Sequence, residues 1–160
     1  MIRTFIAAFA ALSFAVPAHA SSWQDVQSLV DLIKATGTKV QAGECGQKGA
    51  AGFYAYDKDK GVDLLAICSN TVDMQDPDAV WEVMAHEATH VMQACAGGPI
   101  LKDTYVPRVL RELQEYAPHY YQVLSTYRGS HKRKELEAFW MELRSPDVPI
   151  KFFKQFCYED

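Results

Sequence analysis

The segment from Asp76 to Gly98 constrains the fold most, because its residues predict one long helix that has to be buried. Asp76 can cap the first turn, a proline follows at the first helical position, and the pair Gly97-Gly98 ends the helix. Glu87 is the one charged residue among residues 83–92, counting histidine as neutral. This stretch therefore has no polar face that water could cover. The residues expected to face the core are Val80, Met84, Val91 and Cys95.

Two histidines and a glutamate on this helix have the spacing of a metal site. Residues i and i+4 of a helix lie on one face about 6 Å apart along the axis, so His86 and His90 can direct ring nitrogens at one tetrahedral zinc ion. Glu87 lies about 100° around the helix from His86, where it can reach a water on the metal instead of the metal itself. Zinc lowers the pKa of such a water to about 7, and Glu87 would accept its proton.

The alternative is a helix that carries two surface histidines by chance. The uncharged neighbours argue against it, because imidazole and carboxylate groups inside a buried helix need polar partners, and a metal ion supplies them. We therefore expect His86, Glu87 and His90 to belong to a metal site.

A catalytic zinc site needs a third protein ligand and an open fourth position. The extended motif with a glycine and a third histidine soon after the second is excluded, because Gln93 and Ala96 occupy those positions. The remaining candidates are Asp103, Glu112, Glu115, His119, His131, Glu135 and Glu137. A transition-state oxyanion also needs a hydrogen-bond donor besides the metal. The sequence does not rank the possible donors, which are Tyr105, His119, Tyr127, Arg128 and His131.

A second helical segment gives the chain a resemblance to a known family. The stretch HEATH at residues 86–90, followed by ELEA at residues 135–138, resembles the gluzincin metallopeptidases. In that family the third zinc ligand is a glutamate three residues before a small alanine, on a helix packed against the histidine helix. The resemblance, which covers residues 76–143, therefore implies that Glu135 is the ligand and that Ala138 lets the two helices approach.

One position departs from the family pattern. The aspartate that follows the alanine in the family, and orients a zinc-binding histidine, is Phe139 here. Either another group orients His86, or the register shifts and Glu137 is the ligand. Only one of the two glutamates can face the zinc, because residues two apart on a helix lie on opposite sides, and Glu135 is favoured. The alternative for both is an exposed helix face that pairs with neighbouring lysine and arginine residues.

The rest of the chain predicts an α+β fold that is mostly helical. Residues 22–37 predict a capped helix, and residues 52–57 and 62–68 around a KDKG turn predict a β-hairpin. A helical region from Pro107 is interrupted near Pro118, and the aromatic tail packs back on the core. We therefore expect a small zincin-like domain, in which the hairpin and the glutamate-bearing helix pack against the histidine helix.

The first twenty residues predict a secretory signal peptide. Arg3 is their only charge, an apolar run follows, and residues 18–20 form an A-x-A cleavage pattern. The run is too short for a permanent membrane anchor, and a membrane-anchored form is the weaker alternative. We expect cleavage after residue 20, export to the periplasm or the medium, no stable membrane insertion afterwards, and one domain over residues 21–160.

Cysteine content and charge agree with export. The four cysteines all follow the signal segment, which predicts two disulfides in an oxidising compartment. Three pairings exist and the sequence does not choose, although spacing favours Cys45 with Cys68 and Cys95 with Cys157. Zinc binding by cysteine is disfavoured because no CxxC pair occurs. Without Arg3 the chain has 15 basic and 20 acidic side chains, which argues against nucleic acid or an anionic membrane as partner.

These observations lead to two main functional hypotheses. The first is an exported zinc-dependent metallohydrolase, in the first place a peptidase whose peptide or protein substrate lies along the hairpin edge strand. The second is a non-catalytic, zinc-stabilised binding, inhibitor or assembly module. Glu87 favours the enzyme, because a purely structural metal site has no use for a general base. A metal-free helical packing domain is the third possibility, and the sequence does not specify a substrate.

Overall fold

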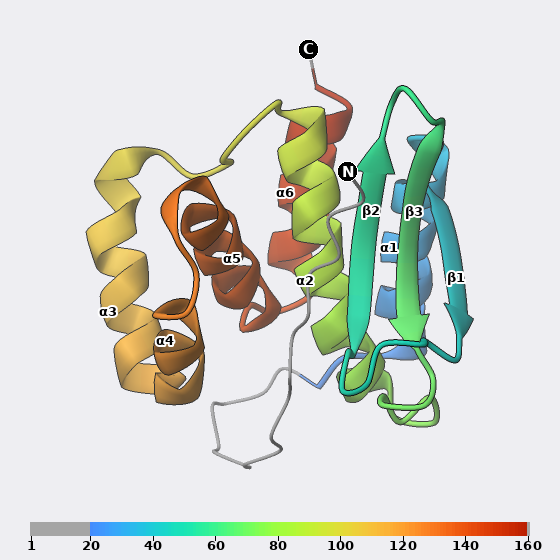
Figure 1. Ribbon diagram of the computed structural model, residues 1–160, viewed down its shortest axis with the longest axis horizontal. Helices are drawn as coiled ribbons and strands as arrows, with labels where there is room; N and C mark the ends of the chain where they lie inside the picture. Colours follow the sequence, from blue (N-terminus) through green and yellow to red (C-terminus); the bar gives the residue numbers. More distant parts are fainter. Residues whose placement is uncertain (1–19, 160) are drawn as a thin grey trace.

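Residues 20–159 are described in the computed structural model of the chain, and over this range six α-helices and a three-stranded sheet form an α+β fold (Figure 1). This confirms the predicted fold class. The expected signal peptide at residues 1–20 lies outside the described range, apart from its last residue. Within that range, no helix combines the length and apolar composition that a bilayer-spanning segment requires.

The elements follow one another along the chain as a helix, three strands and five further helices. The helices are α1 (Trp23–Ala35), α2 (Pro77–Cys95), α3 (Val106–Tyr116), α4 (Pro118–Leu124), α5 (Gly129–Glu142) and α6 (Asp147–Cys157), with a short 3₁₀ helix η1 (Asp103–Tyr105) before α3. The strands are β1 (Lys39–Gly43), β2 (Gly52–Asp57) and β3 (Val62–Cys68).

Local sequence accounts for most of these boundaries. Ser22 and Asp25 form a reciprocal capping box at the start of α1. The Asp76 side chain accepts a hydrogen bond from the first turn of α2, which begins with a proline. The break between α3 and α4 falls beside Pro118, as predicted. The tail, for which the sequence predicted only packing on the core, forms the helix α6.

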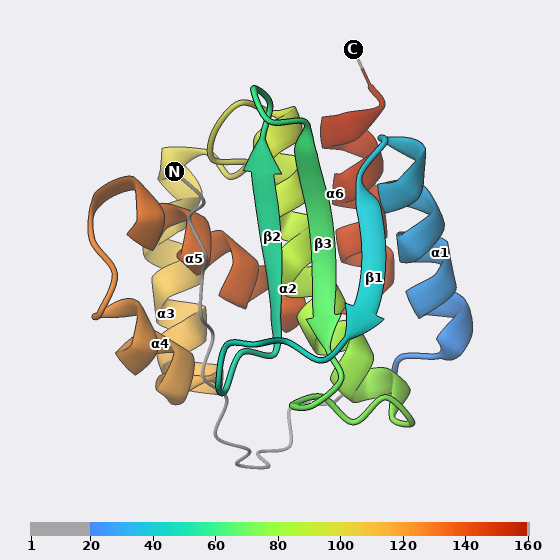
Figure 2. The same ribbon diagram turned by 45° about the vertical axis from the view of Figure 1, so that its right-hand side comes forward.

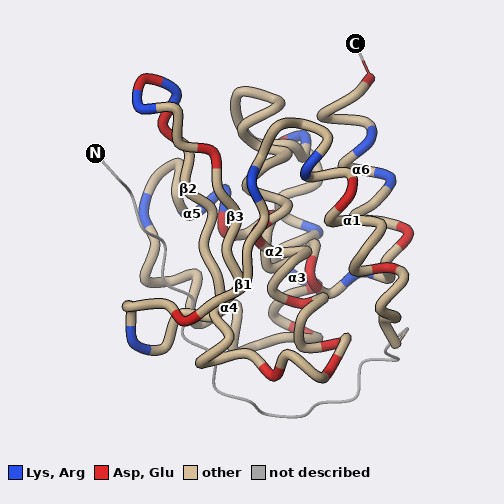
Figure 3. The backbone as a smooth tube through the Cα atoms, turned by 90° about the vertical axis from the view of Figure 1, so that its right-hand side faces the viewer, with Lys and Arg blue, Asp and Glu red and all other residues tan. Residues whose placement is uncertain are grey.

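The sheet has the strand order β1-β3-β2. Strands β2 and β3 pair antiparallel across the turn at residues 58–61, which confirms the predicted hairpin. Acidic and basic residues lie side by side at this turn (Figure 3), and Lys60 forms an ion pair with Asp57 at 3.0 Å. Strand β1 pairs parallel with β3 and was not predicted, because most of its residues are exposed and it lacks an alternating apolar pattern.

Helix α2 lies between the sheet and α5. Figure 2 views the sheet with α2 and α6 behind it and α1 beside β1. Away from the sheet, α2 packs against α5. Residues 83–93 of α2 are all buried, which confirms that the helix is enclosed by the fold. The expectation that Cys95 faces the core is wrong, because this residue lies exposed in the last turn.

Both disulfides join segments that lie far apart in the sequence. Cys45 bonds to Cys68 and so ties the loop after β1 to the end of β3, and Cys95 bonds to Cys157 and so ties the end of α2 to the end of α6. These are the pairings that spacing favoured. Two disulfides indicate that the protein folds in an oxidising compartment.

Candidate metal centre

Helices α2 and α5 bring two histidines and a glutamate together inside the protein. His86 Nε2 lies 3.3 Å from Glu135 Oε2, and His90 Nε2 lies 3.5 Å from Glu135 Oε1. One ligand atom of each residue lies within 4.8 Å of the others, and all three side chains are buried. The group formed by His86, His90 and Glu135 can therefore hold a metal ion.

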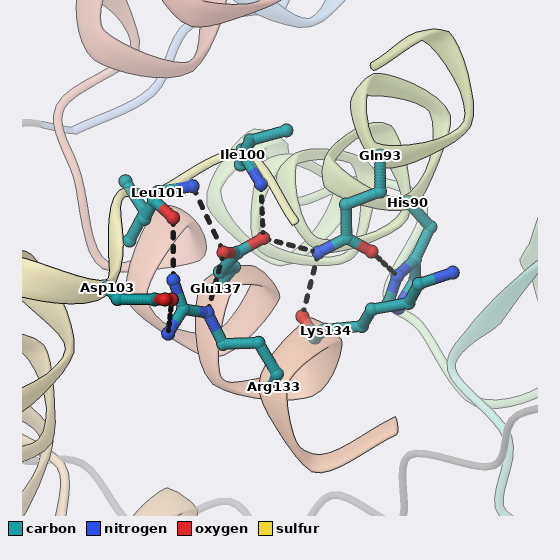
Figure 4. Close-up of polar contacts among 8 residues, drawn as sticks. All are labelled: His90, Gln93, Ile100, Leu101, Asp103, Arg133, Lys134 and Glu137. Atoms are coloured by element: carbon teal, nitrogen blue, oxygen red, sulfur yellow. Dashed lines mark hydrogen bonds and ion pairs between the residues drawn. The ribbon is translucent and has the colours of Figure 1, made fainter. Parts of the chain in front are cut away.

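Glu137 points away from this group, toward the loop that follows α2 (Figure 4). Its carboxylate accepts hydrogen bonds from the backbone amides of Ile100 and Leu101 and from the Arg133 side chain. The geometry thus brings Glu135, and not the alternative Glu137, to the two histidines. Ala138 follows on α5 and is fully buried, as a small residue at a close helix contact has to be.

Glu142 supplies the group that orients His86. Its Oε2 atom lies 2.8 Å from His86 Nδ1, at the end of α5. Phe139, which stands where the gluzincin pattern has an aspartate, instead packs its ring edge-on against His86, with the ring centroids 5.0 Å apart. Sequence reasoning missed Glu142, although it lies two helical turns after Glu135, at a spacing that keeps both carboxylates on one face.

The electrostatics of the cluster reflect its burial. Burial by itself lowers the pKa of His86, but hydrogen bonds with Glu135 and Glu142 outweigh it and raise that pKa well above its ordinary value. Burial lowers the pKa of His90, which therefore stays neutral, the form in which imidazole binds metals. Burial opposes ionisation of Glu135, yet the hydrogen bond with His86 and the electrostatic effects of the neighbouring imidazole rings lower its pKa.

Glu87 lies beside the cluster without belonging to it. It is buried, and its Oε2 atom has no hydrogen-bond partner among the described residues. Burial raises its pKa to about 7, against the effect of the neighbouring His86 and of the backbone amide of Tyr54. Strand β2 approaches it closely at Gly52, where a Cβ atom would lie 2.6 Å from Val83 and 3.3 Å from the Glu87 side chain.

Among the possible oxyanion donors, Tyr127 and His131 are electrostatically coupled to the cluster. Burial and the charges of Glu135 and Glu87 raise the pKa of the half-buried Tyr127 to about 12. His131 contributes to the lowered pKa of Glu135. The three other possible donors have different surroundings. Tyr105 is exposed in η1, and Arg128 is exposed just before α5. His119 makes a ring contact with Tyr120.

The other residues that the sequence offered as a third metal ligand lie outside the metal-binding group. Asp103 forms an ion pair with Arg133, and Glu112 accepts a hydrogen bond from Trp140. Glu115 and His119 are exposed on α3 and α4. The described metal-binding group contains none of these four residues, and it does not contain His131, the fifth remaining candidate.

Comparison with known proteins gives one match. The family described as "Domain of unknown function (DUF8637)" matches residues 23–158, a range that contains every described helix and strand, both disulfides and the metal-binding group. No curated protein and no solved structure matches the chain. Since the match covers far more than half of its length, the chain belongs to the DUF8637 family.

Proposed function

We propose that this protein is an exported, zinc-dependent metallohydrolase, and specifically a peptidase of the gluzincin type. The observation that carries the proposal is the buried group of His86, His90 and Glu135 with Glu87 directly beside it. The oxidising compartment indicated by the disulfides agrees with export to the periplasm or the medium, for which cleavage after residue 20 remains a prediction.

The donor set fits zinc. Two imidazoles and one carboxylate are the protein ligands of many catalytic zinc sites, which leave a fourth position for water. Glu135 Oε1 is buried without a hydrogen-bond partner among the described residues, and a bound cation would compensate the cost of burying it. When bound, zinc would supply Lewis-acid activation of water and of a substrate carbonyl.

Glu87 is the residue to which we assign general-base chemistry. It adjoins His86 on α2, and its free Oε2 atom is available to accept a proton from the attacking water. The same carboxyl group can then return the proton to the leaving amine. Gly52 keeps β2 close enough to hold this carboxylate in place, because any larger residue would collide with Val83.

Tyr127 is the residue to which we assign the hydrogen bond to the transition-state oxyanion. Burial and the charges of both Glu135 and Glu87 raise the pKa of its phenol, and this electrostatic link to the cluster supports the assignment. His131, which is coupled to Glu135, is the second choice. Replacement of Tyr127 by phenylalanine is therefore expected to lower kcat more than it raises KM.

An extended peptide is the substrate class that suits the fold. Strand β2 forms one edge of the sheet and packs against α2, so its main chain lies next to the helix that carries the metal-binding histidines. A peptide that pairs with this edge would be held in an extended conformation. Sequence specificity would then come from side-chain contacts along the same edge.

A second candidate function is a non-catalytic module that a structural metal stabilises. The burial of His86, His90, Glu87 and Glu135 favours it, because structural metal sites are closed to solvent. The two functions differ in the use of Glu87. A structural site has no role for this carboxylate, whereas the peptidase depends on it.

Digestion of a mixed peptide library by wild type and Glu87→Gln, loaded with equal zinc, tests the proposal. Loss of general-base assistance is expected to slow hydrolysis by about 10²–10⁴-fold, while Glu87→Gln keeps its fold and one zinc per chain. A chelator should abolish hydrolysis by the wild type, and added zinc should restore it. Identical cleavage profiles of the two proteins would contradict the peptidase and leave the metal-stabilised module.

A further inference from the structure

His90 is held by a buried hydrogen-bond network that the metal-binding group itself does not explain (Figure 4). Its Nδ1 atom lies 2.9 Å from Gln93 Oε1, one turn further along α2. Gln93 is fully buried, and its amide nitrogen reaches across to α5. The residue that continues the network there is Glu137, the glutamate that does not face the histidines.

The surroundings of Gln93 determine which end of its amide faces His90. The Nε2 atom lies 3.0 Å from the backbone oxygen of Lys134 and 2.9 Å from Glu137 Oε2. A carbonyl oxygen only accepts hydrogen bonds, so this end of the amide has to be the NH₂ group. The opposite orientation would place the Gln93 oxygen against two acceptor oxygens, with no hydrogen atom between them.

Glu137 is itself fixed by donors from two segments. Its Oε2 atom accepts from the backbone amide of Ile100 at 2.9 Å, and its Oε1 atom accepts from the amide of Leu101 at 3.0 Å. The Arg133 side chain donates to Oε1 at 3.0 Å and to the backbone oxygen of Leu101 at 2.6 Å. Because each oxygen already faces a backbone N–H, both act as acceptors, and Glu137 can only receive the hydrogen bond from Gln93.

The network therefore specifies the tautomer of His90. Gln93 Oε1 is an acceptor, so His90 Nδ1 carries the proton and Nε2 carries the lone pair. His90 Nε2 lies 3.5 Å from Glu135 Oε1, so two electron-pair donors lie close together inside the protein. A cation between them turns this repulsion into coordination.

We propose that Gln93 is the positioning residue for His90, and that Glu137, anchored on Ile100 and Leu101, holds Gln93 in the one amide orientation that leaves His90 Nε2 for the metal. The inference rests on the metal centre proposed above and assigns a role to residues outside it. It also gives the two histidines different support, because His86 relies on the carboxylate of Glu142 and His90 on a neutral amide.

Nitrogen-15 NMR of the histidine rings and zinc titration test this role together. Wild type, with and without zinc, is expected to show a protonated Nδ1 on His90. In Gln93→Met, which is similar in size and lacks the acceptor, the slowly exchanging Nδ1–H signal of His90 should disappear while that of His86 stays. The dissociation constant for zinc should rise by about 10–100-fold, the usual effect of losing an outer hydrogen-bond partner of a metal ligand.

Thr89→Val is the matched control. Thr89 is buried on the same helix and its hydroxyl donates to the backbone oxygen of Ala85, so Thr89→Val removes a buried hydrogen bond of α2 in which neither histidine takes part. It should leave zinc affinity and both ring signals unchanged. A wild-type His90 protonated on Nε2, or an unchanged Nδ1–H signal in Gln93→Met, would overturn the role of Gln93 even if zinc binds. Absence of zinc binding by wild type would overturn the metal centre instead.

Discussion

Helix α2 has two buried faces, and the side chains on them differ in polarity. One face carries apolar side chains such as Val80, Met84 and Val91 into a cluster shared with α1, β3 and α6. The face toward α5 carries His86 and His90, whose ring nitrogens all meet polar atoms of other side chains. Burial of apolar surface stabilises a fold directly, whereas buried polar groups cost free energy unless each has a partner. The first face therefore maintains the fold, whereas the second contains the group that can hold a metal ion.

Met84→Ala should lower the stability of the fold, to which the apolar face contributes, without changing the zinc affinity of the histidine face. Met84 is almost fully buried, and truncation of such a residue costs about 2–5 kcal/mol of unfolding free energy. Urea unfolding of the oxidised protein would measure this loss. Zinc affinity under native conditions should stay at the wild-type value, and a parallel loss of zinc would show that the two faces are not separable.

Glu142→Leu should weaken zinc binding at the histidine face and leave the packing of the apolar face unchanged. The substitution removes the acceptor for His86 Nδ1 and is expected to weaken zinc binding by about 10–100-fold. Glu142→Gln keeps an acceptor at this position and should recover most of the affinity. Competition with a fluorescent chelator would measure both variants. Equal affinities of wild type and Glu142→Leu would show that Glu142 does not orient the ligand.

Glu112→Gln should have the smallest effect, because it alters a partly exposed contact between α3 and α5. Glu112 accepts hydrogen bonds from Trp140 and Arg108 at 2.8 Å each. Burial raises its pKa, but these bonds and the charge of Arg144 outweigh burial, so the folded pKa lies below its ordinary value. The ionised side chain therefore stabilises the fold above the unfolded pKa, and this contribution is lost as the pH falls through the folded pKa.

The expected loss for Glu112→Gln at pH 7 is about 0.5–1 kcal/mol. Denaturant unfolding at pH 7 and near pH 3 would measure it, and the difference from wild type should shrink at the lower pH. A difference that stays constant between the two pH values would contradict a contribution from the ionised carboxylate.

The sequence predicted the elements whose signals are local. Helix α2 has its cap, its terminal proline and its glycines within one segment, and the hairpin has two apolar runs around a short turn. Strand β1 could not be predicted, because its partner β3 lies more than twenty residues away and its own side chains are largely exposed. Pairing of this kind depends on tertiary structure, which local patterns do not report.

The residues of the candidate metal centre also divide into those with a local sequence signal and those without one. The spacing of His86 and His90 is a property of one helix, and Glu135 followed from a family resemblance. Glu142 lies 56 residues from His86, so nothing in the local sequence connects the two. For Gln93 the sequence indicates only that the extended histidine motif is absent. Its role depends on Glu137 and on the loop after α2, which become neighbours only in the folded chain.

The proposed metal centre requires that His86, His90 and Glu135 bind one zinc ion while Glu87 does not. The most direct measurement is the metal content of the folded, oxidised protein by mass spectrometry under native conditions, for wild type, Glu135→Gln and Glu87→Gln. We predict one zinc per chain in wild type and in Glu87→Gln, and loss of the zinc in Glu135→Gln. Retention of zinc by Glu135→Gln at wild-type affinity, or a wild type that binds no zinc, would show that these three residues do not form a zinc site.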